Sequence, residues 1–193
     1  MLYIVLIALS TFLVALVNIC YKAFDYAWWM LLIYSILSTA IVILIDGITA
    51  LIIRHLPEKW FRYDRKIYFV SKKEVAFYRF LNIKAWKDRV PELGGFTSFH
   101  KNKVQDPTSV EYIERFLLEI DYGWMIHIVS VVTGFLILLM DYKIFTGGNM
   151  TIGLSIGFPI AIINGILNLM PAFILRYNYP RLMALLQMAK RKK

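Results

Sequence analysis

The amino-acid sequence predicts an all-α integral membrane protein with four transmembrane helices. Hydrophobic residues make up 59% of the 193 positions and charged residues 18%, a composition too apolar for a soluble domain of this size. Four apolar runs are long enough to cross a hydrocarbon core about 30 Å thick, which takes about 20 residues of helix. The predicted spans are approximately residues 2–21, 28–53, 124–140 and 152–175.

These spans divide the chain into four parts. Residues 1–53 hold spans one and two, residues 54–123 form a basic, amphipathic helical segment, residues 124–175 hold spans three and four, and residues 176–193 form a basic tail. The first 21 residues lack a basic start and a small-residue cleavage site, so we expect an uncleaved helix there. With Cys20 as its single cysteine, the chain cannot form an internal disulfide or a cysteine-based metal site, and we expect no metal.

Lys and Arg residues are distributed unevenly between the loops. Residues 54–123 hold 14 of them and residues 176–193 hold six, whereas the other loops offer only Lys22 and Lys143. Because basic loops stay on the inner side, the two basic segments and both termini are expected in the cytoplasm, at the cell membrane. An even number of spans agrees with that orientation. Since the basic residues adjoin apolar spans, we expect them to contact anionic lipid and not nucleic acid.

The basic segment contains the signature of a helix that begins at Ser71. In a capping box, the Ser71 oxygen accepts from the Glu74 amide and the Glu74 carboxylate reaches back to the Ser71 amide. The helix is expected to run to about Arg89, ahead of Pro91 and Gly94–Gly95. At 100° per residue, one broad arc holds Val75, Ala76, Phe80, Ile83, Trp86 and Val90, together with the cations Arg79 and Lys87.

Two interpretations of those cations stay open. In one, the stems of Arg79 and Lys87 lie on the bilayer and their charged ends reach the lipid phosphates. In the other, they bind an anionic donor. A second helix is expected to begin at Asp106–Pro107 or at Thr108–Glu111 and to continue into span three near Gly123.

Small residues recur every fourth position in span four. Such a ridge lets another helix approach closely, so we expect a packing role for Gly153, Gly157, Ala161 and Gly165.

Polar residues also lie within the predicted spans, where they usually face a cavity or the bundle interior. With the orientation above, Asp46, His127, Asn164 and Asn168 all belong to the inner leaflet, and helical rise brings them to similar depths. A shared polar pocket is therefore possible. The alternative is structural: Asp46 supports a kink beside Gly47, His127 is an interfacial residue, and the asparagines join helices by hydrogen bonds.

Glu119 and His127 invite comparison with a catalytic dyad. Eight residues along one helix separate two side chains by about 12 Å axially, so they can touch only if Gly123 breaks the helix. Otherwise the two would flank a substrate. The sequence has no HxxxxD box, no G-x-S-x-G elbow, no phosphate-binding loop and no H-E-x-x-H motif.

The sequence from residue 56 onward resembles the glycosyl-4,4′-diaponeurosporenoate acyltransferase family, bacterial membrane enzymes that attach a fatty acyl chain to a glycosylated carotenoid. The resemblance rests on residues 56–62 (LPEKWFR), on Glu74 through Tyr78 to the stretch 83–88 (IKAWKD), on Glu119 eight residues before His127, and on residues 176–182 (RYNYPRL). The last stretch is the most specific. Where the family tends to carry an Arg and a second Glu, this chain has Tyr122 and Trp124.

The resemblance implies transfer of a fatty acyl chain from a cytosolic thioester donor to a hydroxyl of a lipid-linked sugar or other lipid acceptor. The co-substrate would be acyl-CoA or acyl carrier protein, with no further cofactor. His127 is the best base, because an imidazole titrates near neutral pH, and Glu119 or Asp46 could orient it. The residues expected to bind substrate are Arg79, Trp86, Lys87, Asp88, Asn168, Arg176, Tyr177, Asn178 and Arg181.

Two other classes of function compete with this one. A non-catalytic membrane module, which uses its polybasic face to recruit anionic lipid or a partner enzyme, explains the charge and the aromatic residues equally well. It gives no reason for Asp46, His127 and Asn168. A transporter or channel subunit would need polar groups through the full depth of the bundle. The outer half offers only Ser10, Thr11, Asn18, Ser35, Ser38 and Thr39.

The expected orientation can be tested with reporter fusions or cysteine labelling. A reporter after Lys193 should lie in the cytoplasm and one within Gly147–Gly148 should lie outside, because the charge asymmetry fixes the direction of insertion. The reverse pattern would contradict both the orientation and a cytoplasmic site.

Overall fold

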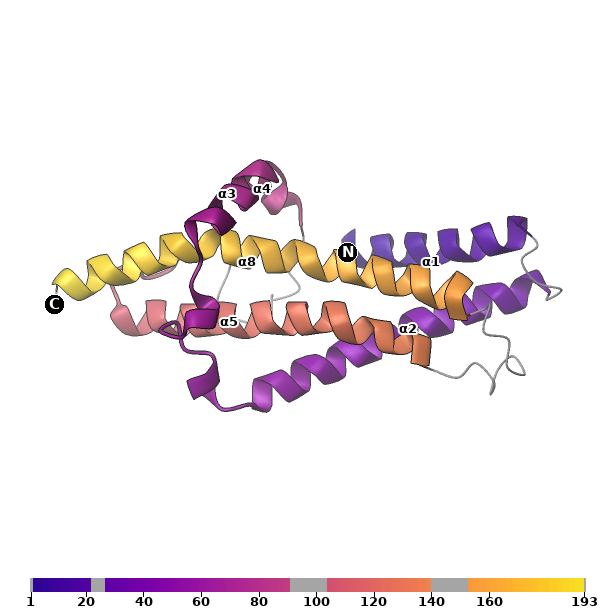
Figure 1. Ribbon diagram of the computed structural model, residues 1–193, viewed down its shortest axis with the longest axis horizontal. Coiled ribbons are helices and arrows are strands. Elements are labelled where there is room, and N and C mark those ends of the chain that lie inside the picture. The colour runs from indigo at the N-terminus through magenta and orange to yellow at the C-terminus, as the bar shows by residue number, and fades with distance from the viewer. Residues whose placement is uncertain (1, 22–26, 91–103, 140–152, 193) are drawn as a thin grey trace. The chain divides into compact units, whose positions relative to one another are not determined.

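The computed structural model describes residues 2–21, 27–90, 104–139 and 153–192, and the residues described are largely helical (Figure 1). The α-helices are α1 (Leu2–Cys20), α2 (Trp28–His55), α3 (Lys72–Phe80), α4 (Ile83–Trp86), α5 (Val110–Thr133) and α8 (Phe158–Lys192). Shorter helical turns cover Glu58–Trp60, Lys66–Tyr68, Lys87–Arg89, Gly134–Leu139 and Gly153–Gly157. The predicted all-α class is thus confirmed for this part of the chain.

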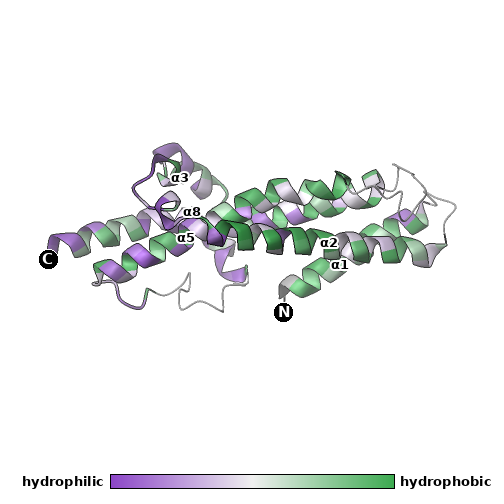
Figure 2. Ribbon diagram, turned by 90° about the horizontal axis from the view of Figure 1, so that it is seen from below, coloured by the Kyte–Doolittle hydropathy of each residue, from purple (hydrophilic) through white to green (hydrophobic). Residues whose placement is uncertain are grey.

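Among the described residues, three helical stretches are long and apolar enough to cross a membrane, and not the four that the sequence predicts. They are Trp28–His55, Val110–Leu139 and Gly153–Lys192. The stretch Ile4–Cys20 of α1 is shorter and reaches only about 25 Å at 1.5 Å per residue, less than the hydrocarbon core. Figure 2 shows that α1 and α2 are mainly apolar and that α3 is mainly hydrophilic. The parity argument for orientation loses its basis, and the charge asymmetry alone supports it.

The described helices belong to two compact units. Unit 1 comprises Met1–Leu51 and Val129–Asn168, and unit 2 comprises Ile52–Ile128 and Leu169–Lys193. The helices α2, α5 and α8 each continue from one unit into the other.

Unit 1 is built on an apolar core with hydrogen bonds between its helices. Asn18 donates to the carbonyl oxygen of Ser155 (3.1 Å), and the hydroxyls of Thr49 and Thr133 lie 3.2 Å apart. Such bonds are a common way to join helices in a membrane. The core residues are Val14, Leu31, Tyr34, Val42, Ile137, Ile156, Ile160 and Ala161.

The ridge of small residues packs inside unit 1. Gly157, Ala161 and Gly165 are buried, and Gly153 is half-buried at the start of the π-helical turn Gly153–Gly157. Gly134 also permits a close contact, because a Cβ atom built on it would lie 2.6 Å from Nδ2 of Asn164. The backbone at Gly134 therefore leaves room for the Asn164 amide.

In unit 2, the predicted capping box is confirmed but the helix that follows is shorter than expected. The Ser71 Oγ accepts from the Glu74 amide at 3.1 Å. The helix ends at Phe80, because Asn82 adopts a left-handed conformation (φ 50°), which asparagine tolerates better than most residues. Two short turns, α4 and Lys87–Arg89, then carry the chain to Val90. The residues predicted to end the helix, Pro91 and Gly94–Gly95, lie outside the described residues, as does Gly147–Gly148.

This break makes the predicted single arc of residues 75–90 wrong. Within α3 the buried side chain is that of Tyr78, whereas Phe80 is 84% exposed and Ala76 is exposed. A helical wheel assumes continuous rotation, so Asn82 shifts the direction of every later residue.

The second helix of the basic segment begins at Val110, later than predicted. Ser109 caps it by accepting from the Tyr112 amide (3.2 Å), while Asp106 accepts from the amides of Thr108 and Ser109 (3.1 Å each). The helix α5 then passes through Gly123 without a break. A Cβ at Gly123 would lie 3.1 Å from Cδ1 of Leu175, so this glycine lets α8 come close to α5 in unit 2.

The residues predicted as a tail continue α8 to Lys192. Leu182, Leu186 and Ala189 are buried, so this stretch is part of the packed structure of unit 2.

Arg176 is the polar centre of unit 2. Its side chain is buried, and its Nε and Nη2 donate to the two carboxylate oxygens of Glu74 at 2.8 and 2.9 Å. Further bonds run from Nη1 to the Tyr68 carbonyl (2.7 Å) and from Nη2 to the Phe69 carbonyl (3.2 Å). The guanidinium carbon lies 4.7 Å from the ring centre of Trp124. One side chain of α8 thus holds three parts of the chain segment 68–74.

The electrostatics around Arg176 follow from burial and pairing. Burial alone would raise the pKa of Glu74, but hydrogen bonds from Arg176 and Tyr78 outweigh it, and the pKa is lowered. Burial, followed by the charge of Asp121, raises the pKa of Tyr68 to about 12. Burial and the hydrogen bond to Glu74 likewise raise the pKa of Tyr78. Glu74 is therefore ionised and both tyrosines are neutral near neutral pH.

Replacing Arg176 should destabilise the protein strongly. Arg176→Gln leaves the Glu74 carboxylate partly buried without its cation, a change that typically costs about 3 to 5 kcal/mol. Thermal unfolding of the detergent-solubilised protein measures this loss of stability. The matched control is Arg181→Gln, because Arg181 is an exposed cation on the same helix. Equal melting temperatures for the two variants would contradict the assigned role.

The ion pair should also give the protein a specific acid sensitivity. Because the pKa of Glu74 is lowered in the folded state, its stabilisation is present above the ordinary glutamate pKa of about 4.3 and is lost as the pH falls through the lowered value. In Glu74→Gln that part of the pH dependence should vanish in melting curves recorded between neutral and acidic pH. An unchanged pH dependence would rule out this contribution.

Two glycine substitutions should have opposite effects in unit 1. Gly134→Ala forces Asn164 to move and should destabilise by about 1 to 3 kcal/mol, as overpacking does. Gly47→Ala meets no atom within 4 Å and should be neutral or stabilise by up to about 1 kcal/mol, because alanine favours a helix. Thermal unfolding of both variants tests the close contact between Gly134 and Asn164. A Gly134→Ala variant as stable as the wild-type protein would refute it.

Candidate functional site

The structure divides the predicted site residues between the two units. Asp46 and Asn168, with Asn164, lie in unit 1. Unit 2 holds Glu119, His127, Arg79, Trp86, Lys87, Asp88, Arg176, Tyr177, Asn178 and Arg181. The predicted site residues thus form two groups, one in each unit.

In unit 1, the structure brings three of the predicted polar residues together. Asn168 donates to Oδ2 of Asp46 at 3.0 Å, and Asn164 lies 3.4 Å from Oδ1. Asn168 also donates to the carbonyl oxygen of Asn164 at 3.1 Å. Two amides from α8 thus hold both oxygens of a carboxylate on α2. This arrangement fits a polar site in the membrane, and it also fits the structural alternative of hydrogen bonds between helices.

In unit 2, Glu119 and His127 do not form a dyad. Because α5 is continuous from Val110 to Thr133, the two residues lie about 12 Å apart along its axis. Glu119 pairs instead with Arg115 (2.8 Å) and Arg54 (3.2 Å), and its side chain is 11% exposed. His127 is half-buried on the same helix. The predicted role of Glu119 in orienting His127 is therefore wrong, for a geometric reason.

Four of the predicted substrate-binding residues form a cluster: Lys87, its neighbour Trp86, and Tyr177 and Asn178 of α8. The Nζ of Lys87 donates to Oδ1 of Asn178 at 3.4 Å and lies 5.6 Å from the ring centre of Tyr177. Trp86, the preceding residue, donates to the Leu81 carbonyl at 3.0 Å, which fixes the turn that carries Lys87. Two stretches far apart in the sequence, residues 83–88 and 176–182, thus meet at this lysine. The aromatic ring and the amide oxygen both stabilise its positive charge.

The other predicted binding residues differ in exposure. Arg79, Asp88 and Arg181 are exposed. Arg176 is 5% exposed and gives four hydrogen bonds to Glu74 and to backbone carbonyls. Its charge is paired within the protein, so its contacts are those of a positioning residue. Binding of substrate phosphates by these residues stays a prediction.

Sequence reasoning missed Asp121, a carboxylate that is 1% exposed. The Tyr179 hydroxyl lies 3.3 Å from its Oδ2. A signal was present in the sequence, because Asp121 falls four residues after Leu117 and three before Trp124, on the buried side of α5.

The two residues that depart from the family pattern both have structural partners. Tyr122 stacks on Phe61 with ring centres 4.2 Å apart, and its hydroxyl lies 3.3 Å from the Leu56 carbonyl. Trp124 lies under Arg176 and meets Tyr68 edge to face at 5.9 Å. These aromatic rings pack the linking segment, residues 56–90, against α5.

No group of three or more His, Cys, Asp or Glu residues that could hold a metal ion occurs in the described part of the chain.

Comparison with known families gives one match. The family model of glycosyl-4,4′-diaponeurosporenoate acyltransferase matches residues 57–188. Comparisons with curated proteins and with solved structures gave no match. The matched range contains α3, α4, α5 and most of α8, and it includes every predicted site residue except Asp46. Since the match covers more than half of the sequence, the chain belongs to the glycosyl-4,4′-diaponeurosporenoate acyltransferase family.

Proposed function

We propose that this membrane protein transfers a fatty acyl chain from a cytosolic thioester, acyl-CoA or acyl carrier protein, to a hydroxyl of a lipid-linked sugar or another lipid acceptor. The observation that carries the proposal is the family match over residues 57–188, which supports an acyltransferase activity. The three apolar helices support an acceptor that arrives within the membrane. The family description, which names a glycosylated carotenoid acid, makes such a glycolipid the first acceptor to test.

His127 is the proposed general base. It removes the proton from the acceptor hydroxyl, and the oxygen attacks the thioester carbonyl to give a tetrahedral intermediate. When the intermediate collapses, the carbon–sulfur bond breaks and the imidazolium returns the proton to the thiolate. An ester and a free thiol result, so atoms and charges balance. Imidazole suits both steps because its ordinary pKa of about 6.5 lies near neutral pH.

Lys87 is the proposed contact for the phosphates of the donor. Its ammonium group is supported by Asn178 and Tyr177, and the exposed Arg79 and Arg181 add positive charge in the same unit. Arg176 acts through this cluster, because it fixes the helix that carries Tyr177 and Asn178. We therefore assign binding to Lys87 and positioning to Arg176.

The orientation remains part of the proposal. The basic residues of the linking segment would face the cytoplasm, where the donor is found. Large apolar side chains of the same segment are exposed, among them Phe69 (73%) and Phe80 (84%), as expected of a segment that lies on a membrane surface. This exposure also favours the second candidate, a non-catalytic module that binds anionic lipid. The family match favours the enzyme.

Replacing His127 should abolish transfer without unfolding the protein. Loss of a positioned base typically lowers the rate about 10² to 10⁴-fold, so His127→Ala should retain its melting temperature and lose acyl transfer from acyl-CoA to the glycolipid. The matched control is His55→Ala, since His55 is an exposed histidine at the end of α2. Wild-type turnover by His127→Ala would exclude this mechanism.

A second variant separates binding from chemistry. Lys87→Ala should raise the KM for the donor more than it lowers kcat, and the effect should shrink at high salt, because its proposed role is charge complementarity. If the wild-type protein binds anionic vesicles and transfers nothing from either donor, the recruitment module is the better description.

A further inference from the structure

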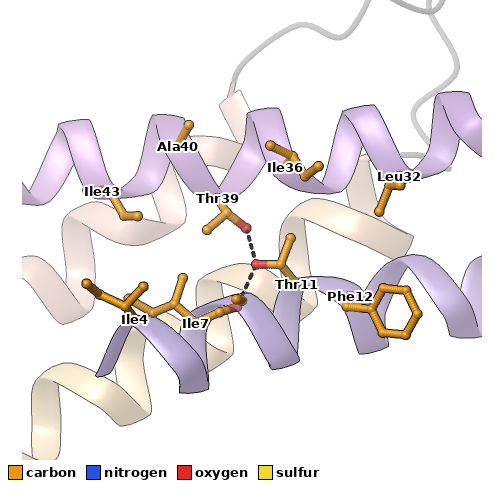
Figure 3. Close-up of a pocket in the computed structure, with 10 residues that line it drawn as sticks. Ile4, Ile7, Thr11, Phe12, Leu32, Ile36, Thr39, Ala40 and Ile43 are labelled. Carbon is orange, nitrogen blue, oxygen red and sulfur yellow. Dashed lines mark hydrogen bonds between the residues drawn. The ribbon is translucent and has the colours of Figure 1, made fainter. Parts of the chain in front are cut away.

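An apolar groove runs between α1 and α2 in unit 1 (Figure 3). Its volume is about 490 Å³, within the range of about 300 to 1,000 Å³ typical of sites for small ligands. The groove lies outside the range matched by the family model. Its lining residues are Ile4, Ile7, Ala8, Thr11, Phe12, Leu32, Ile36, Thr39, Ala40 and Ile43.

The chemistry of the lining selects a hydrocarbon. Among these residues, Thr11 and Thr39 carry the polar side-chain atoms, and their hydroxyls lie 2.9 Å apart (Figure 3). The Thr11 hydroxyl also lies 2.8 Å from the Ile7 carbonyl. Because the hydroxyls satisfy each other and the backbone, the lining offers a polar ligand little in return for its lost hydration. An apolar chain loses nothing by entering.

The shape of the groove suits one extended chain. Along α2 it reaches from Leu32 to Ile43, which corresponds to about 17 Å at the helical rise. Figure 3 shows Leu32 and Phe12 toward one end and Ile4 and Ile43 toward the other. An elongated site of this kind matches a flexible fatty acyl chain.

One end of the groove leads toward the polar group of unit 1. Asp46 follows Ile43 by three residues, so the two lie on neighbouring positions of the same side of α2. Asn168 and Asn164 hold its carboxylate from α8. An acyl chain in the groove can therefore keep its methyl end among apolar residues and place its polar end near hydrogen-bonding groups.

We propose that the groove between α1 and α2 binds the fatty acyl chain of the donor, with the thioester end toward Asp46. This inference rests on the proposed function, because an acyltransferase must shelter the long chain that it moves. Transfer of each methylene of a cytosolic donor out of water is favourable, and a groove of fixed length would set a preferred chain length. Phospholipid of the bilayer carries the same kind of chain and is the competing source.

Photoaffinity labelling tests the groove without requiring turnover. The probe is a long-chain acyl-CoA with a diazirine near its methyl end, added to the full-length protein in nanodiscs. It should label peptides from residues 4–12 and 32–43, and excess unmodified acyl-CoA should prevent the labelling. A phospholipid carrying the same diazirine is the second probe. Equal labelling by the phospholipid, unaffected by acyl-CoA, would identify bilayer lipid and overturn the proposal.

A matched pair of variants makes the test specific. Ile36→Trp fills the groove and should lower labelling by acyl-CoA about tenfold. Ile33→Trp introduces the same side chain at an exposed position of α2 outside the lining and should leave labelling unchanged. Equal labelling of the two folded variants would refute the site. If Ile36→Trp does not fold, Ala40→Leu is the second variant. This smaller change should shift the preference of the protein toward shorter acyl chains.

The outcomes separate this inference from the proposed function. Groove labelling by a protein that transfers no acyl chain to any acceptor would support the groove and contradict the enzyme. The opposite result has two parts: Ala40→Leu transfers acyl chains with the wild-type chain-length preference, and no peptide of the groove is labelled. That result would support the enzyme and overturn the groove.

Discussion

The ion pair between Arg176 and Glu74 is the interaction on which unit 2 depends. It joins α8 to α3 across 102 positions of sequence, and the same guanidinium fixes the carbonyls of Tyr68 and Phe69. Burying two charges is costly, and the cost is offset only when the geometry is good and the remaining donors are satisfied. Here the pair is bidentate and Trp124 covers the guanidinium. Once the linking segment is held in this way, the turn that follows Asn82 can bring Lys87 to Asn178.

Local signals were predictable from the sequence, and the direction of later side chains was not. The capping box at Ser71 depends on residues three apart, and the structure confirms it. The end of α3 depends on one backbone angle at Asn82, and nothing in the apolar pattern indicates which asparagine adopts a left-handed conformation. A wheel drawn through residues 75–90 therefore does not describe one helix, although Ile83 and Val90, which it places on the apolar arc, are buried. The α1 helix shows a similar limit, since hydropathy detects its apolar character but a few residues of length decide whether it can cross a membrane.

Partners far apart in the sequence account for the remaining differences. The sequence predicts that Arg176 binds substrate phosphates because it is a cation in a specific motif, and it indicates Glu74 as a capping residue and as part of the family resemblance, not as the partner of Arg176. Asp46, Asn164 and Asn168 were predicted together because all three are polar residues within apolar helices, where such groups seek one another. The rule that polar groups within apolar helices seek one another requires no knowledge of the fold. Asp121 obeys the same rule, but it precedes the predicted start of span three at residue 124, so the rule was not applied to it.

Helical periodicity divides the specific stretch 176–182 into two faces with different tasks. Arg176, Tyr179 and Leu182 are buried, whereas Tyr177 and Asn178 are half-buried beside Lys87 and Arg181 is exposed. The buried face builds unit 2, and the other face offers the groups suited to binding. The family model matches this stretch as a whole, so the match covers the buried residues and the cluster around Lys87 together. Membership of the family supports an acyltransferase activity in general, and the inward residues of the stretch show how the same helix also holds unit 2 together.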